Sequence, residues 1–164
     1  MRHLLVTLLL LLAFGLHAKA PHDTDPSQAD LSIWVNEAIV HTYTFDYKNY
    51  LADQKNIAHY FSAKAWLNYS AALTSSKLLD TIKKNLYYVS AVAQSTPQIK
   101  KRGPGVWLAT MPVMVVYRNA QKEVKQTLLV TINFSVSETK TGVRGLQIES
   151  FESKVIQPAC ECNR

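Results

Sequence analysis

The stretch from residue 43 to residue 73, YTFDYKNYLADQKNIAHYFSAKAWLNYSAAL, is dense in aromatic side chains and is the most informative part of the chain. Its second half begins at Ser62, a favourable helix N-cap, and continues with an apolar stripe at helical spacing: Trp66, Tyr69 and Leu73. Its first half is less periodic and predicts a turn and a short helix. It contains no recognisable catalytic motif, so most of its aromatic side chains are expected to pack in a core.

Amphipathic helices are predicted on both sides of this stretch. Upstream, Ser27 and Asp30 resemble a capping box, and the helix that follows should run to about Phe45. Its apolar positions recur at helical spacing: Leu31, Trp34, Val35, Ala38, Ile39 and Thr42. Downstream, a third short helix ending near Asn85 is indicated by Leu78, Leu79, Ile82 and Leu86.

Beyond residue 86 the pattern changes to that of strands, with expected spans of 88–99, 106–118, 123–138 and 143–156. Residues 100–105 contain Gly-Pro-Gly and are expected to form a loop. Pro112 lies inside the second span and suggests an edge strand or a bulge. Ile148 and Phe151 fall on opposite faces of the last strand, which also predicts a bulge. Helices followed by about four antiparallel strands indicate an α+β fold, with the helices on one face of a curved sheet.

The N-terminal residues have the three-part pattern of a secretory signal peptide. Arg2 and His3 precede an apolar run over residues 4–16, and an A-x-A pattern ends at Ala20. The run is shorter than the roughly 20 residues of a membrane-spanning helix. We expect a cleaved signal peptide (1–20), a flexible leader (21–30), one domain (31–157) and a tail (158–164). An uncleaved anchor is the competing interpretation of the N-terminal segment.

The charge balance argues against a nucleic-acid partner. The chain carries 18 Lys and Arg against 12 Asp and Glu, and loss of Arg2 and Lys19 with a signal peptide would leave a net charge of +4. The densest basic cluster is Lys100, Lys101 and Arg102. Nucleic-acid binders usually show a longer basic stripe with interleaved aromatics. A solvated loop is the simplest interpretation of this cluster, and contact with an acidic partner or lipid head groups is the functional one.

The two cysteines lie close to the C-terminus, at Cys160 and Cys162. In an exported protein a disulfide is the first hypothesis. Residues i and i+2 of a strand have Cα atoms about 6.5 Å apart, which is near the upper limit for a disulfide, so a bridge here needs a bent chain. Free thiols, a strained local bridge and a cross-link to another chain all stay open. Two thiols alone do not make a structural zinc site.

No catalytic, cofactor-binding or metal-binding residue is predicted. The histidines show no metal-binding spacing, and neither a phosphate loop nor a nucleophile elbow is present. One enzymatic alternative places a buried Asp46, or His41, at the base of a pocket in a cone-shaped domain. The simpler interpretation is that Asp46 caps or terminates a helix. Tyr47 and Tyr50 fit either a core or a partner surface, because a tyrosine can bury its ring and expose its hydroxyl.

The chain resembles the periplasmic domain of DotI/IcmL-type proteins, inner-membrane components of type IVB secretion and related conjugation systems. The resemblance begins with Phe45-Asp46-Tyr47 and Asn49-Tyr50, followed by Tyr60-Phe61-Ser62 and Trp66. It continues through LLDTIKKNLYYVSAVAQSTPQI (78–99), VWLATMPVMVVY (106–117), residues 128–136 and GLQIESF (145–151). No single piece is specific, but their order and spacing together carry the match.

This resemblance implies a nuclear-transport-factor-like cone of helices on a curved sheet. It also implies a non-enzymatic role in assembling a secretion apparatus, with protein partners, a homo-oligomer and no cofactor. DotI/IcmL proteins carry a cytoplasmic segment and a membrane-spanning helix, which a signal-peptide-like segment replaces here. We therefore expect a periplasmic relative that contacts the membrane only indirectly, with secretion to a host target as an alternative. Lys100, Lys101, Arg102, Tyr47 and Tyr50 are the candidate partner contacts.

Overall fold

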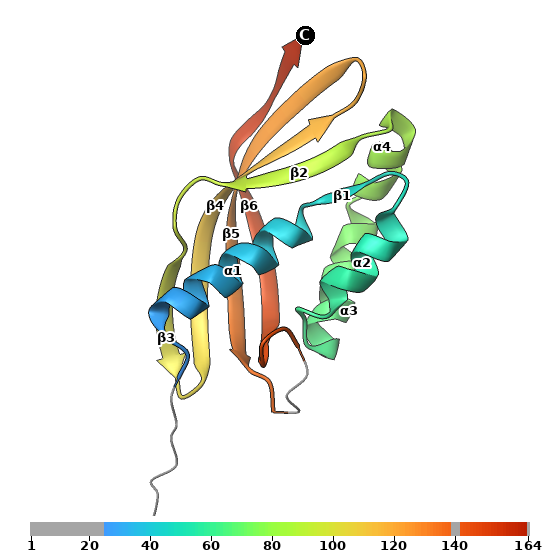
Figure 1. Ribbon diagram of the computed structural model, residues 1–164. Coiled ribbons are helices and arrows are strands. Elements are labelled where there is room, and N and C mark those ends of the chain that lie inside the picture. The colour runs from blue at the N-terminus through green and yellow to red at the C-terminus, as the bar shows by residue number, and fades with distance from the viewer. Residues whose placement is uncertain (1–24, 139–141, 164) are drawn as a thin grey trace, which may run out of the picture.

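The computed structural model describes residues 25–138 and 142–163, in which helices cover one face of a strongly curved antiparallel sheet (Figure 1). The expected α+β fold is confirmed. The first half of the chain supplies the helices: α1 (Gln28–Thr42), α2 (Tyr50–Ala58), α3 (Ala63–Ser75) and α4 (Leu78–Asn85). The strands are β1 (Phe45–Asp46), β2 (Tyr88–Ala93), β3 (Gln98–Gly103), β4 (Val106–Arg118), β5 (Lys122–Val136) and β6 (Leu146–Asn163). The predicted signal peptide (1–20) and residues 21–24 of the predicted leader lie outside the described residues. The leader was expected to reach residue 30, which is wrong, because residues 28–30 already form the first turn of α1.

The sheet has six strands, ordered β1-β2-β4-β5-β6, with β3 pairing β4 beyond the end of β2. The single strand expected over residues 88–99 is wrong, because residues 94–97 leave the sheet and separate β2 from β3. Pro97 lies in this break and has no backbone N–H to donate to a ladder. The chain thus pairs first with one end of β4 and then with the other.

The loop expected over residues 100–105 is also wrong. Lys100 and Lys101 pair with Leu108 and Trp107, so β3 and β4 form a hairpin whose turn contains only Pro104 and Gly105. Gly105 has a φ of +62°, a conformation that glycine adopts without a Cβ clash. Charged side chains on an edge strand keep it from pairing with other sheets, so a basic run fits a strand at this place.

Pro112 occupies the centre of β4. The edge strand or bulge expected there is wrong, because β4 is an interior strand that pairs with β5 in unbroken register at Pro112. Its carbonyl oxygen accepts a hydrogen bond of 2.9 Å from the Gln94 backbone N–H at the end of β2. In a strand, the N–H and C=O of one residue point to the same neighbour, so the missing proline N–H faces the β2–β3 break. The proline is tolerated because no ladder bond is needed there.

β6 contains the bulge that the sequence predicts. Ile148 pairs with Phe134 and Ser150 with Asn133, which leaves Glu149 as the extra residue and shifts the facing side chains. The strand then continues past residue 157 to Asn163, pairing with the first residues of β5. Residues 158–163 are therefore the end of β6 and do not form a separate tail.

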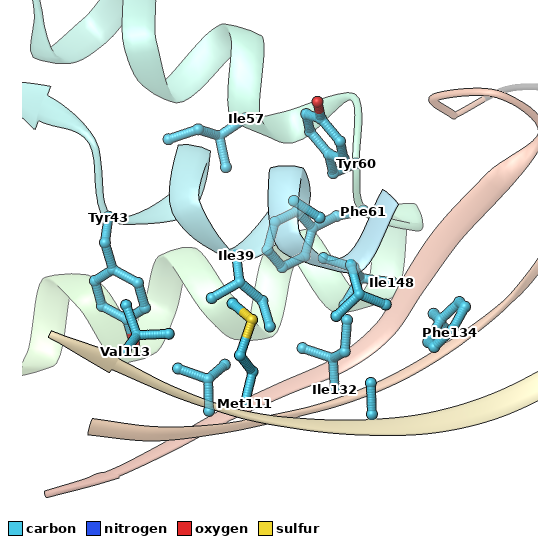
Figure 2. Close-up of a cluster of buried hydrophobic side chains, with 14 of the residues drawn as sticks. Ile39, Tyr43, Ile57, Tyr60, Phe61, Met111, Val113, Ile132, Phe134 and Ile148 are labelled. Atoms are coloured by element: carbon cyan, nitrogen blue, oxygen red, sulfur yellow. The ribbon is translucent and has the colours of Figure 1, made fainter. Parts of the chain in front are cut away.

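The core lies between α1 and the inner face of the sheet. All six residues of the predicted α1 stripe are buried: Leu31, Trp34, Val35, Ala38, Ile39 and Thr42. Figure 2 shows Ile39 among buried side chains of the sheet, near Met111. The predicted caps are confirmed, with the Ser27 and Ser62 hydroxyls accepting hydrogen bonds from the Asp30 and Ala65 backbone N–H groups. Most aromatic side chains of residues 43–73 thus pack in or against the core between the helices and the sheet.

Candidate docking surfaces and groove

The predicted basic contact lies on the edge strand β3, and Lys100, Lys101 and Arg102 are all exposed. The Lys101 ammonium forms an ion pair with the Asp25 carboxylate, next to the start of α1. Lys100, which pairs with Leu108, faces the opposite side of the strand from Lys101. The three charges therefore do not form one continuous patch, because successive residues of a strand face opposite sides.

Tyr47 and Tyr50 lie at the other end of the sheet, where β1 meets α2. The Tyr47 ring packs edge-on against Tyr88, with centroids 5.5 Å apart, and Tyr50 packs edge-on against Phe45 at 5.9 Å. The ammonium of Lys83 lies 5.7 Å from the centre of the Tyr50 ring, within the range of a cation–π contact. Both tyrosines are half-exposed, so each ring packs against its neighbour while part of the side chain stays accessible to a partner.

The structure does not bring the two predicted contact sets together. Tyr88, the neighbour of Tyr47, pairs with Arg118 at one end of β4, whereas Lys101 pairs with Trp107 near the other end. These positions are on the order of 30 Å apart along the strand at about 3.3 Å per residue. They define two separate surfaces.

Asp46 serves the local backbone. Its Oδ1 accepts hydrogen bonds from the backbone N–H groups of Lys48 (2.6 Å) and Asn49 (2.9 Å). The Asn49 side-chain amide donates a third to Oδ2 (3.1 Å). The Asn49 backbone bond is the main cause of a lowered pKa for the Asp46 carboxyl, which makes it a weaker base than an ordinary aspartate. Asp46 therefore holds the turn between β1 and α2 and does not cap or terminate a helix as expected, since α1 ends at Thr42 and the N-cap of α2 is Asn49. The arrangement gives no support to the general-base alternative.

His41 lies on the surface of the helix that covers the sheet. It is exposed on α1, where its ring packs edge-on against Tyr60 with centroids 5.7 Å apart. Among the residues that the structure describes, no group of three or more His, Cys, Asp or Glu side chains could hold a metal ion.

Cys160 is an exposed free thiol on β6. It pairs with Lys125, and Cys162 pairs with Glu123, so the ladder with β5 runs through both cysteine positions. The local Cys160–Cys162 bridge weighed from the sequence stays a prediction beside the free thiol of Cys160. A bridge would require the strand to bend away from the ladder.

A groove of about 810 Å³ lies between α3 and β6, and none of the predicted contact residues lines it. One wall consists of α3, with Asn68, Tyr69 and Ala72 facing the space. The other wall is the stretch of β6 that contains Phe151 and Val155. Asp46 and His41 are not part of the lining, so this groove is not the pocket weighed for either residue.

Aromatic rings close one end of this groove. Phe151 packs against Tyr69 and Tyr43, with centroid distances of 5.5 Å and 5.9 Å. Burial raises the pKa of Tyr43 to about 12, an effect that the neighbouring Ser153 partly offsets. Burial also raises the pKa of Tyr69 and Tyr117. The three tyrosines therefore stay neutral over the physiological range.

Glu149, the bulge residue, sits at the border of the groove near the start of α3. Burial opposes its ionisation, but hydrogen bonds from the Ser135 hydroxyl and the Gln147 amide, both 2.8 Å, help leave its carboxyl pKa below the usual value. The ionised carboxylate is therefore a fixed negative charge at neutral pH. No Lys or Arg is among the residues that line the groove.

Two sequence signals could have located the groove. α3 carries alanines at positions 65 and 72, one heptad apart on the face toward the sheet, and small residues there leave space. The apolar side chains of β6 change from one face of the strand to the other around Glu149, and this change marks the bulge beside α3. Neither signal identifies a groove without knowledge that α3 and β6 are neighbours.

The curved sheet, the helices on its inner face and the groove define a cone-shaped α+β domain of the nuclear-transport-factor-like class. The family described as "Type-IV b secretion system, inner-membrane complex component", of the DotI/IcmL type, matches residues 18–155. The chain belongs to this DotI/IcmL family of type IVB secretion components. No curated protein matches the chain.

Solved structures agree with this assignment. An IcmL-like type IV secretion system protein from Legionella pneumophila is 49% identical, with a TM-score of 0.80 over 85% of this chain and 100% of that one. The periplasmic domain of DotI is 27% identical, with a TM-score of 0.73 over 80% of this chain and 97% of that one. A periplasmic fragment of TraM shares the fold at 22% identity, with a TM-score of 0.64 over 79% and 98% of the two chains.

None of the helices in residues 25–138 and 142–163 combines the length and apolarity needed to cross a bilayer.

Proposed function

We propose that this protein is a non-enzymatic periplasmic assembly component of a type IVB-like secretion or conjugation apparatus, acting by docking on other proteins. The observation that carries the proposal is the family match over residues 18–155, together with 49% identity to an IcmL-like secretion protein. The export pattern ending at Ala20 supports a periplasmic location. The signal peptide over residues 1–20 and a single domain that extends to the end of β6 belong to this proposal.

Two surfaces are proposed as partner contacts. The basic edge strand with Lys100, Lys101 and Arg102 offers exposed positive charge to an acidic partner, although Lys101 already pairs with Asp25. Tyr47 and Tyr50 offer half-exposed aromatic surface at the opposite end of the sheet, the residue type that often dominates interface energetics. Because the two sets are far apart, they would contact different neighbours in an assembly.

The enzymatic or ligand-binding alternative near Asp46 has less support. The Asp46 carboxylate is committed to three local hydrogen bonds, and the groove lies elsewhere. Secretion to a host target stays as the alternative that the same export signal would allow.

Affinity capture of the tagged full chain from cross-linked, detergent-solubilised envelopes tests the proposal, with mass spectrometry of the captured proteins. Components of a type IVB-like apparatus should be enriched over those captured by an unrelated exported protein with the same tag. Charge reversal at Lys100 and Arg102, or alanine at Tyr47 and Tyr50, should reduce capture of some components. Reversal of the exposed Lys55 on α2 is the matched control. A protein found in the medium with no secretion component bound would overturn the proposal.

A further inference from the structure

β6 has a free edge beside α3. It is the last strand of the sheet, and among the described residues its outer edge is bonded at Leu146, whose N–H donates to the Val143 carbonyl, and at Ile148. There the Ile148 N–H donates to the Tyr60 carbonyl (2.7 Å), and its own carbonyl accepts from the Ser62 N–H (2.9 Å). Beyond this point no strand of the described part of the chain covers the edge, and α3 lies alongside it (Figure 1).

The free part of the edge has the length of a short strand. Residues 150–155 pair in regular register with residues 128–133, between the bulge at Glu149 and a second register shift after Val155. Six residues match the usual length of a strand in globular proteins. The two irregularities and Pro158 limit longer edge-to-edge pairing with a second sheet, which argues against a second copy as the occupant.

The groove supplies pockets next to this edge. Phe151, Ser153 and Val155 share the inner face of β6 and line the groove together with Leu128. Ala72 on α3 leaves the space opposite them. A free strand edge that borders an apolar groove and a helix is the arrangement in which proteins bind extended peptides by strand addition. Main-chain hydrogen bonds then give affinity, and alternate side chains enter the groove.

The charge of the groove specifies its occupant further. Among the residues lining it, Glu149 and Glu152 carry carboxylates and none carries a positive charge. Lys64 acts on Glu149 from α3, and Lys154 shares with Glu152 the face of β6 opposite Phe151, but neither lysine lines the groove. A complementary segment would therefore present Lys or Arg beside its apolar residues.

We infer that β6 residues 150–155 and α3 bind an extended basic segment of a partner protein, with apolar side chains at alternate positions, by strand addition. The inference rests on the proposed docking role and adds the kind of partner segment. It is separable from the secretion assignment, because peptide binding can be measured with the purified chain alone.

A displayed library of random peptides, selected for binding to the full chain, tests the inference. The Ala72→Trp variant fills the groove, and Ala71→Trp is the matched control, since Ala71 is exposed on the same helix but does not line the groove. Selected peptides should alternate apolar residues and contain Lys or Arg. They should bind Ala72→Trp at least about tenfold more weakly than wild type or Ala71→Trp.

A synthetic copy of a selected peptide, N-methylated at alternate amides, separates strand addition from simple apolar contact. One of the two alternate sets of methylated amides should abolish binding, because it removes the N–H groups that would bond to β6. The inference is overturned if no peptide is selected, if Ala72→Trp binds as well as wild type, or if neither methylated set weakens binding. Failure of the envelope capture with successful peptide selection would overturn the secretion role alone.

Discussion

The indole Nε1 of Trp34 donates a hydrogen bond of 2.8 Å to the backbone carbonyl of Val143, 109 residues further along the chain. This bond ties the core helix α1 to the turn that leads into β6. Next to it, Arg144 forms an ion pair with Glu37, with Nη2 2.7 Å from Oε2. One contact is partly buried and the other is exposed, so they should contribute unequally to stability.

Replacement of Trp34 by Phe should lower the free energy of unfolding by about 1–3 kcal/mol, because the Val143 carbonyl loses its partner. The ring at position 34 should still stack on Phe134, whose centroid lies 5.1 Å from that of Trp34 in the wild-type protein. Glu37→Gln should change stability by less than about 1 kcal/mol, since the ion pair is solvent-exposed. Urea unfolding of both variants checks the order, and equal losses would contradict it.

Burial on α1 should decide the cost of truncating isoleucine. Ile39 is completely buried, whereas Ile33 on the same helix is 53% exposed. Ile39→Ala should therefore lose about 2–5 kcal/mol through lost burial and a residual cavity. Ile33→Ala should stay within roughly 0.5 kcal/mol of wild type. The midpoints of urea unfolding measure both, and a large loss at Ile33 would indicate that α1 packs with another face inward.

The helical half of the fold could be predicted because its signals are local. The spacing of Trp34 and Ile39 identifies the buried face of α1, and Ser62 identifies the start of α3, without knowledge of any distant residue. The bulge near Glu149 was also predictable, because a change of face within one strand is visible in the sequence.

Strand pairing and the groove could not be predicted in the same way. Whether Lys100 lies in a loop or a strand depends on Leu108 across the hairpin, and the position of Pro112 depends on where β2 stops. The groove depends on α3 lying beside β6, elements separated by about 70 residues. Such non-local relationships leave only weak traces in the local pattern.

Cys160 should react with a thiol reagent in the folded protein without prior reduction, because it is exposed and free. Protein purified without reductant, alkylated without denaturant and analysed by intact mass, tests this. Cys160→Ser should remove one alkylation, which assigns the signal. A product that is alkylated only after reduction would instead indicate a bridge, local or to a second chain, and a bent end to β6.

Burial of Tyr43 should make the protein sensitive to alkali. Its pKa is 10.0 in an unperturbed tyrosine and about 12 here, so the folded state prefers the neutral phenol. The stabilisation from keeping this phenol neutral is complete below pH 10 and should be lost as the pH rises to about 12. A shift of this size corresponds to roughly 3 kcal/mol.

The Tyr43→Phe variant separates this effect from general alkaline unfolding. Without the hydroxyl, the variant should lose less stability than wild type between pH 10 and about 12, while any difference below pH 10 reflects packing alone. Urea unfolding across this range, with tyrosinate absorbance to follow ionisation, measures both quantities. Parallel losses in the two proteins would mean that Tyr43 ionises without unfolding and that its end of the groove is open to water.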